Sequence, residues 1–133
     1  MMPKDLHPHD PANVAAEKIL DSAFKIHRQY GPGLLESAYE HLLVYELYNN
    51  HSLKVETQKT LPLIHEGHKI DAGYRIDLLV DDCVIVELKC SEKLLPIHEA
   101  QLLTYLKLSE IRLGLLINFK AVLLKQGLKR LIL

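Results

Sequence analysis

Residues 74–89 read Tyr-Arg-Ile-Asp-Leu-Leu-Val-Asp-Asp-Cys-Val-Ile-Val-Glu-Leu-Lys, two apolar runs on either side of a short acidic turn. Aliphatic and β-branched residues dominate both runs, which favours two neighbouring strands of one sheet. Side chains alternate between the faces of a strand, so Glu87 and Lys89 share one face at the end of the second run. Charges on a core strand need partners, a metal ion or a water-filled cleft, because burying an unpaired charge is unfavourable.

The loop between the two runs decides whether Asp77 and Glu87 lie on the same face. A two-residue turn at 81–82 would turn Asp77 to the face away from Glu87, since a slip of one residue reverses every side chain. A three-residue loop, Asp81–Cys83, or a bulge places Asp77 directly across from Glu87. We predict that register, because it brings both carboxylates beside Lys89.

In that register the side chains form a candidate metal site. Asp77 and Glu87 supply hard oxygen ligands suited to Mg²⁺ or Mn²⁺, and the carbonyl of Leu88 can add a third. Lys89 would orient or help to deprotonate an attacking water and stabilise charge in the transition state of phosphodiester hydrolysis. Glu36, on an earlier predicted helix, would complete the metal shell if that helix packs over the sheet edge.

Gln101 and Tyr105 are one turn apart on a later predicted helix and face the same way, where they could hold a phosphate or a nucleobase. Simpler structural explanations exist for all of these residues. A Glu-x-Lys pattern is common on solvated strand faces, and Asp77 could pair with Arg75 or Lys89. The Gln101 and Tyr105 pair is also typical of a half-buried helix flank.

Hydrophobic periodicity and turn residues predict the element order αα-βββ-α-β followed by a C-terminal β-hairpin. The predicted elements are helices over 13–29, 34–48 and 97–108, strands over 53–64, 68–80, 83–89 and 111–119, and hairpin arms at 121–124 and 128–133. Asn13 would cap the first helix, and the nearly all-apolar strand 111–119 would be central. We expect a mobile tail over 1–12 and one α/β domain over 13–133, a mixed sheet with helices packed on it.

Composition limits the class of protein. The chain has 133 residues, of which 48% are hydrophobic and 25% charged, as in an ordinary globular domain. A net charge of −1 is not that of a strong, non-specific nucleic-acid binder. No apolar run approaches the roughly 18 residues of a membrane span, and the start lacks a signal-peptide core, which favours the cytoplasm.

The two cysteines, Cys83 and Cys90, are expected to be free thiols. On one extended strand they would be about 23 Å apart. A disulfide needs Cα atoms within about 7 Å of each other. A reducing compartment is the simple inference.

The segment Gly33–Tyr39, Gly-Leu-Leu-Glu-Ser-Ala-Tyr, matches the signature that names the GxxExxY protein family. Downstream blocks also resemble that family, in the order Asp77–Val80, Val86–Lys89, Ala100–Leu106 and Gly114–Phe119. The resemblance covers residues from about 14 to 133. The family is placed in the PD-(D/E)XK nuclease superfamily, whose restriction-endonuclease-like fold is a mixed sheet of about four core strands flanked by helices.

The resemblance also implies roles for single residues. It makes Asp77 the motif aspartate, Glu87-Leu88-Lys89 the E-x-K, Gln101 and Tyr105 the Q-x-x-x-Y element, and Glu36 the helical acid that precedes the sheet. Ile76 departs from the superfamily's name, which has proline at this position, and such departures are common among its members.

The leading hypothesis is therefore a Mg²⁺- or Mn²⁺-dependent nuclease that acts on DNA, or less readily on RNA. The first alternative is a nucleic-acid-binding or protein-interaction module that keeps the sheet without the activity. The second is purely structural, with Asp77, Glu87 and Lys89 joined in a salt-bridged cluster within a homodimer.

Overall fold

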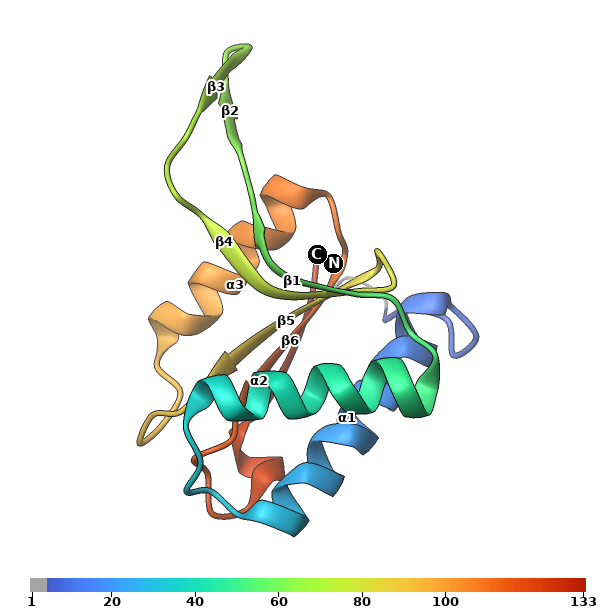
Figure 1. Cartoon of the computed structure of the whole chain (residues 1–133). Coiled ribbons are helices and arrows are strands. Elements are labelled where there is room, and N and C mark those ends of the chain that lie inside the picture. The colour runs from blue at the N-terminus through green and yellow to red at the C-terminus, as the bar shows by residue number, and fades with distance from the viewer. Residues whose placement is uncertain (1–4) are drawn as a thin grey trace.

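A five-stranded mixed sheet lies at the centre of the computed structural model, which describes residues 5–133 (Figure 1). The strand order is β1-β4-β5-β6-β7, with bounds Val55–Thr60, Arg75–Val80, Val84–Lys89, Leu113–Asn118 and Leu128–Ile132. Strands β5 and β6 are parallel and the other neighbours antiparallel. This is the predicted restriction-endonuclease-like architecture, with five strands in the main sheet rather than about four.

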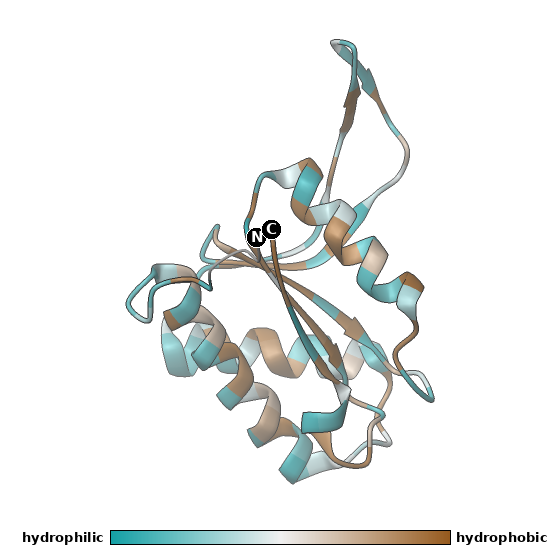
Figure 2. Cartoon of the chain, turned by 180° about the vertical axis from the view of Figure 1, so that it is seen from behind, coloured by the Kyte–Doolittle hydropathy of each residue, from teal (hydrophilic) through white to brown (hydrophobic). Residues whose placement is uncertain are grey.

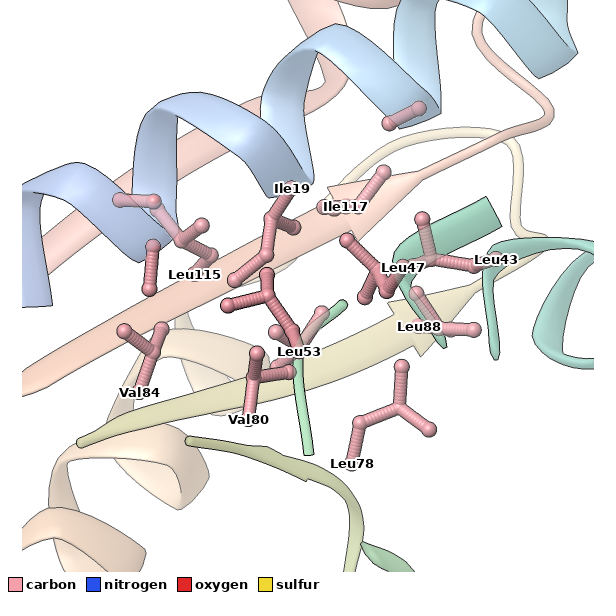
Figure 3. Close-up of a cluster of buried hydrophobic side chains, with 14 of the residues drawn as sticks. Ile19, Leu43, Leu47, Leu53, Leu78, Val80, Val84, Leu88, Leu115 and Ile117 are labelled. Atoms are coloured by element: carbon pink, nitrogen blue, oxygen red, sulfur yellow. The ribbon is translucent and has the colours of Figure 1, made fainter. Parts of the chain in front are cut away.

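Helices cover both faces of this sheet. Figures 1 and 2 show α1 (Pro11–Tyr30) and α2 (Glu36–Tyr45) on one face, and α3 (Pro96–Ser109), which connects β5 to β6, on the other. The larger core lies under α1 and α2, and Figure 3 shows its aliphatic side chains meeting between helix and sheet. The smaller core lies under α3. Every residue of β6 is buried, which confirms the predicted central strand: a strand covered on both faces has no polar face to present.

The predicted register between the two decisive strands is confirmed. Leu78 pairs with Val86, and Val80 pairs with Val84, so three residues, 81–83, form the loop. Asp81 and Asp82 there adopt left-handed backbone angles, with φ of 53° and 56°, which aspartate tolerates better than most residues. The same register places Asp77 across from Glu87.

The first helix begins earlier than predicted, at Pro11, and Asn13 is not its cap. The Asp10 side chain accepts a hydrogen bond from the Ala12 N–H at 2.9 Å, and Pro11 occupies the first turn, where its missing N–H is not needed. Asn13 instead donates from its side-chain amide to the carbonyl oxygens of Leu6 and, one residue on, His7.

Part of the segment predicted to be a mobile tail makes defined contacts. Leu6 is buried in the larger core, and Asp5 forms a salt bridge with Arg130 of β7 at 2.8 Å. Residues 1–4, the rest of that prediction, lie outside the described residues.

The second predicted helix differs at both ends. Leu35, inside the predicted helix 34–48, is extended and 76% exposed, and α2 begins at Glu36. Tyr39 faces the core instead and is fully buried. The helix continues beyond Tyr45 as a π-helical turn, η1 (Glu46–Asn50).

The predicted strand 53–64 divides at Pro62, because proline has no N–H to donate to a sheet ladder. Beyond the break, β2 (Leu63–His65) and β3 (His68–Ile70) pair only with each other. They form a two-stranded arm that extends away from the body between β1 and β4 (Figures 1 and 2). Glu66 and Gly67, between the predicted strands 53–64 and 68–80, form its tip.

The predicted C-terminal hairpin is wrong in its first arm. Residues 121–124 form no strand, and Leu124–Gly127 is a 3-10 turn, η2, before β7. The physical reason is that β7 pairs directly with β6, with Leu128 opposite Ile117, so residues 119–127 form the connection that turns the chain from one strand to the other.

Cys83 and Cys90 are both free, as predicted. No helix within residues 5–133 is long and apolar enough to span a membrane.

Two glycines give a test of this packing. A Cβ on Gly127 would lie 2.6 Å from the backbone oxygen of Asn118, whereas one on Gly114 would meet the movable side chain of Leu102 at 2.9 Å. We expect Gly127→Ala to lower the free energy of unfolding by about 1–3 kcal/mol, as overpacking does, and Gly114→Ala to lower it less. Urea denaturation measures both, and equal losses would contradict the close approach at Gly127.

Candidate active site

The site lies where β4 and β5 separate. Leu78 and Val86 are the last residues paired in the ladder between these strands. Beyond them, the Asp77 N–H donates to Glu87 Oε2 at 2.7 Å, and the Leu88 N–H donates to Asp77 Oδ2 at 2.9 Å. Each carboxylate therefore satisfies a main-chain group of the opposite strand that the ladder has left unpaired.

The carbonyl of Leu88 points into the same fork. In a strand the N–H and C=O of one residue face the same neighbour, and the Leu88 N–H faces Asp77. Consistent with this alternation, the next carbonyl, of Lys89, faces β6 and accepts from the Phe119 N–H at 3.0 Å. The Leu88 oxygen thus lies on the side of Asp77, as the proposed third ligand requires.

The sheet is distorted around Asp77. Ile76 belongs to the core under α3, but Leu78, two residues on, belongs to the core under α1 and α2. Opposite Asp77 on β1, Gln58 has a φ of 50°, which is unfavourable for a residue with a side chain. Its amide donates to Glu40 Oε1 at 2.8 Å and to Asp77 Oδ1 at 3.4 Å, which links α2 to the fork.

Glu87 is buried, with 4% of its surface exposed. Burial raises its pKa to about 8, and the charge of Asp77 adds to the effect. The Asp77 N–H and the Lys89 amine oppose the rise, and Glu36 contributes a further increase. An excess of negative charge at a desolvated point is the electrostatic condition that a bound cation relieves.

Glu36 begins α2, at its first helical position, and is exposed. Partial burial raises its pKa, as does the charge of Asp77, while Lys89 and the Cys90 N–H lower it. Glu36 therefore lies within the electrostatic field of the fork. However, no three Asp, Glu, His or Cys side chains in residues 5–133 are close enough to bind one ion, so the expected convergence of three carboxylates is not formed.

The physical reason is that the two inner carboxylates are turned onto main-chain N–H groups. One carboxylate oxygen of Asp77 and one of Glu87 accept a main-chain hydrogen bond from the opposite strand. Glu36 is at the start of α2. Asp77 and Glu87 lie across from each other as predicted, and Glu36 feels the charge of Asp77 without joining a three-carboxylate group.

Tyr39 holds the start of α2 in place. Its hydroxyl donates to the Gly31 carbonyl at 2.5 Å and accepts from the Leu34 N–H at 3.0 Å. Its ring stacks on Phe119 at the end of β6, with centroids 4.3 Å apart and an interplanar angle of 4°. The tyrosine of the Gly33–Tyr39 motif thus fixes the loop that delivers Glu36.

Lys89 ends β5 and is half-buried. None of the salt bridges among the described residues involves Lys89, Asp77 or Glu87. The alternative in which these three form a salt-bridged cluster is therefore wrong for this arrangement.

Gln101 and Tyr105 line one pocket of about 440 Å³ on α3. Tyr105 is buried, and Gln101 is exposed. Burial raises the pKa of the Tyr105 hydroxyl, and the charges of Glu87 and Asp77 raise it further. The structure thus places Tyr105 near the fork, and Gln101 lines the same pocket as Tyr105.

Sequence reasoning missed Glu40, Gln58 and Tyr74. Glu40 follows Glu36 by one helical turn, so helical spacing could have found it. Gln58 stands in an exposed, polar strand, and nothing in its neighbourhood predicts its backbone angle. Tyr74 lies inside the predicted strand 68–80, and no local pattern predicts the contact of its ring with that of Tyr105.

The family model of the PD-(D/E)XK nuclease superfamily matches residues 13–131. Searches of curated proteins and of solved structures give no match. The match is to the superfamily, and the assignment to GxxExxY stays a prediction.

The buried carboxylate predicts a pH-dependent stability. Because the pKa of Glu87 rises from 4.5 to about 8 on folding, the folded chain holds this proton more tightly, so stability falls as the pH rises through that window. Without divalent cations, Glu87→Gln should lack this part of the slope and exceed the parent in free energy of unfolding by about 3 kcal/mol near pH 8.

Denaturant titrations from pH 5 to about 8 measure this difference. Glu17→Gln, on the exposed side of α1, is the matched control and should keep the slope of the parent. A parent and a Glu87→Gln variant with parallel pH profiles would contradict the desolvation of Glu87.

Proposed function

We propose that this chain, which belongs to the PD-(D/E)XK nuclease superfamily, hydrolyses phosphodiester bonds of nucleic acid, of DNA in preference to RNA. The observation that supports this most is the fork between β4 and β5. There a buried Glu87 of raised pKa, Asp77 and the Leu88 carbonyl share one side, with the Lys89 amine on the same strand.

The donor atoms of the fork fit a hard divalent cation, Mg²⁺ or Mn²⁺. Asp77, Glu87 and the Leu88 carbonyl offer oxygen only. These two carboxylates and one carbonyl would hold the ion, and Glu36 would add attraction from further out. When bound, such an ion polarises a phosphate oxygen and lowers the pKa of a coordinated water.

Lys89 would act on the phosphate and the attacking water. The positive charge of its amine stabilises negative charge at the fork, since Lys89 lowers the pKa of both Glu87 and Glu36. A fixed ammonium group stabilises the charge that develops on the phosphoryl oxygens, and it orients water by hydrogen bonding.

Gln101 and Tyr105 would bind the substrate beside the fork, since both line the pocket on α3. Nucleic acid is the partner that the superfamily implies. Cytoplasmic location and a homodimer stay predictions.

A second function is favoured by one observation. Asp77 and Glu87 already satisfy main-chain N–H groups, which is also what a purely structural carboxylate pair would do. A nucleic-acid-binding or protein-interaction module without cleavage would keep this arrangement and need no ion.

Metal binding separates the two functions. In a calorimetric titration with Mn²⁺ we expect heat of binding from the parent, and none from Asp77→Asn, because the amide lacks the charge that a hard cation requires. Glu36→Gln should only weaken binding. A parent that binds no Mn²⁺ would support the module without cleavage.

Cleavage tests the role of the lysine. We expect Lys89→Ala to keep the fold and Mn²⁺ binding but to lower cleavage by about 10²-fold or more, since a fixed charge at the transition state is lost. Lys93→Ala, an exposed lysine in the following loop, is the matched control and should cleave like the parent.

The assay incubates single- and double-stranded DNA and RNA with Mg²⁺ or Mn²⁺. Glu87→Ala, which should be inactive, shows the background from contaminating nucleases. Undiminished cleavage by Lys89→Ala would remove that residue from the mechanism.

A further inference from the structure

The pocket on α3 is lined by further aromatic and polar side chains besides Gln101 and Tyr105. It measures about 440 Å³, within the range of small-molecule sites, roughly 300–1,000 Å³. Tyr74, from the base of the arm, lines it together with His98, Gln101 and Tyr105. We call this the aromatic pocket. Its lining, Tyr74, Ile97, His98, Ala100, Gln101, Thr104 and Tyr105, contains no lysine or arginine.

The aromatic pocket adjoins the fork. Tyr105 packs in the core under α3 with Ile76 and Ile85, which are the near neighbours of Asp77 and Glu87 along their strands. Its ring meets that of Tyr74 edge to face, with centroids 6.1 Å apart and an interplanar angle of 63°. Tyr74 is half-buried, so part of its ring is open to a ligand.

The polar groups of the pocket suit the edge of a nucleobase. The Leu95 N–H donates to His98 Nδ1 at 3.0 Å, which leaves His98 Nε2–H as a donor. The exposed amide of Gln101 offers both a donor and an acceptor. A phosphate would call for a cation, and the lining supplies none, so the aromatic pocket favours a base over a phosphate.

A second hollow continues the path beyond Tyr74. It measures about 320 Å³ at the base of the arm and includes Tyr74, Lys69 and Pro62. Tyr74 therefore lines both hollows, and the second carries a lysine, Lys69, together with a carboxylate, Asp71.

We propose that the aromatic pocket binds one unpaired nucleobase of a single-stranded nucleic acid, stacked on Tyr74, next to the bond to be cut. A base inside a duplex is stacked and paired and cannot enter such a pocket without being flipped out. The substrate class is therefore single-stranded nucleic acid. This inference rests on the proposed function for its cleavage, but its binding step is measured without cleavage.

The test uses the full chain and a fluorescein-labelled oligothymidylate in EDTA, with a hairpin duplex of DNA as the comparison. Anisotropy should show tighter binding of the single strand. Tyr74→Leu, which keeps apolar bulk but has no ring, should weaken it by about tenfold, in line with the loss of one base–aromatic stack. Tyr74→Phe, the matched control, should bind the single strand like the parent. The parent, Tyr74→Leu and Tyr74→Phe should bind the duplex equally.

Oligonucleotides with a single abasic site at successive positions give a second test of the same contact. Removing the base at one position should weaken binding to the parent by about tenfold. The same removal should not weaken binding to Tyr74→Leu any further, because the base and the ring form one contact. Equal binding by parent and Tyr74→Leu, a uniform abasic profile, or an equal loss on the duplex would overturn the base pocket.

Cleavage assays distinguish the two failures. If Tyr74→Leu loses single-strand affinity but the parent cleaves nothing with Mg²⁺ or Mn²⁺, the base pocket stands and the nuclease proposal falls. If the parent cleaves single strands and duplexes alike and Tyr74→Leu does so equally, the nuclease proposal stands and the base pocket falls.

Discussion

The exchange between two carboxylates and two main-chain N–H groups is the interaction on which the site depends. Asp77 accepts from the Leu88 N–H, and Glu87 accepts from the Asp77 N–H. These bonds let β4 and β5 part while leaving no unpaired donor at the fork. An opened sheet would otherwise leave buried donors unsatisfied, which is unfavourable. The fork is thus a stable feature that also leaves the Leu88 carbonyl on the side of Asp77.

Three separate elements support this fork. Helix α2 brings Glu36 to it, and the Tyr39 hydroxyl and its stack on Phe119 hold that helix start. Gln58 connects Asp77 to α2 through Glu40. Glu87, at the centre of the fork, lies in an unfavourable environment for a negative charge, because it is both buried and close to other carboxylates. Strongly perturbed carboxyl groups of this kind are typical of functional sites.

Local sequence patterns predicted most of the elements and the central pair of acids. The apolar run 111–119 is a strand buried on both faces, and the alternation along 83–89 placed Glu87 and Lys89 on one side. The failures have physical causes. Asp10, which precedes the proline, caps the first helix in place of Asn13. Residues 121–124 form no strand because β6 and β7 pair directly and the chain between them makes the connection.

The sequence by itself determined most of the strands and their order of appearance, because side-chain alternation is a local property. It limited the register of β4 and β5 to a few loop geometries, of which the structure has the three-residue loop that sets Asp77 across from Glu87. Only the tertiary structure decided that Glu36, Asp77 and Glu87 do not gather closely enough to bind one ion together, and that Tyr74 meets Tyr105. These relations depend on how a helix or arm packs across the sheet. Packing between distant segments follows from the whole core and not from any short pattern.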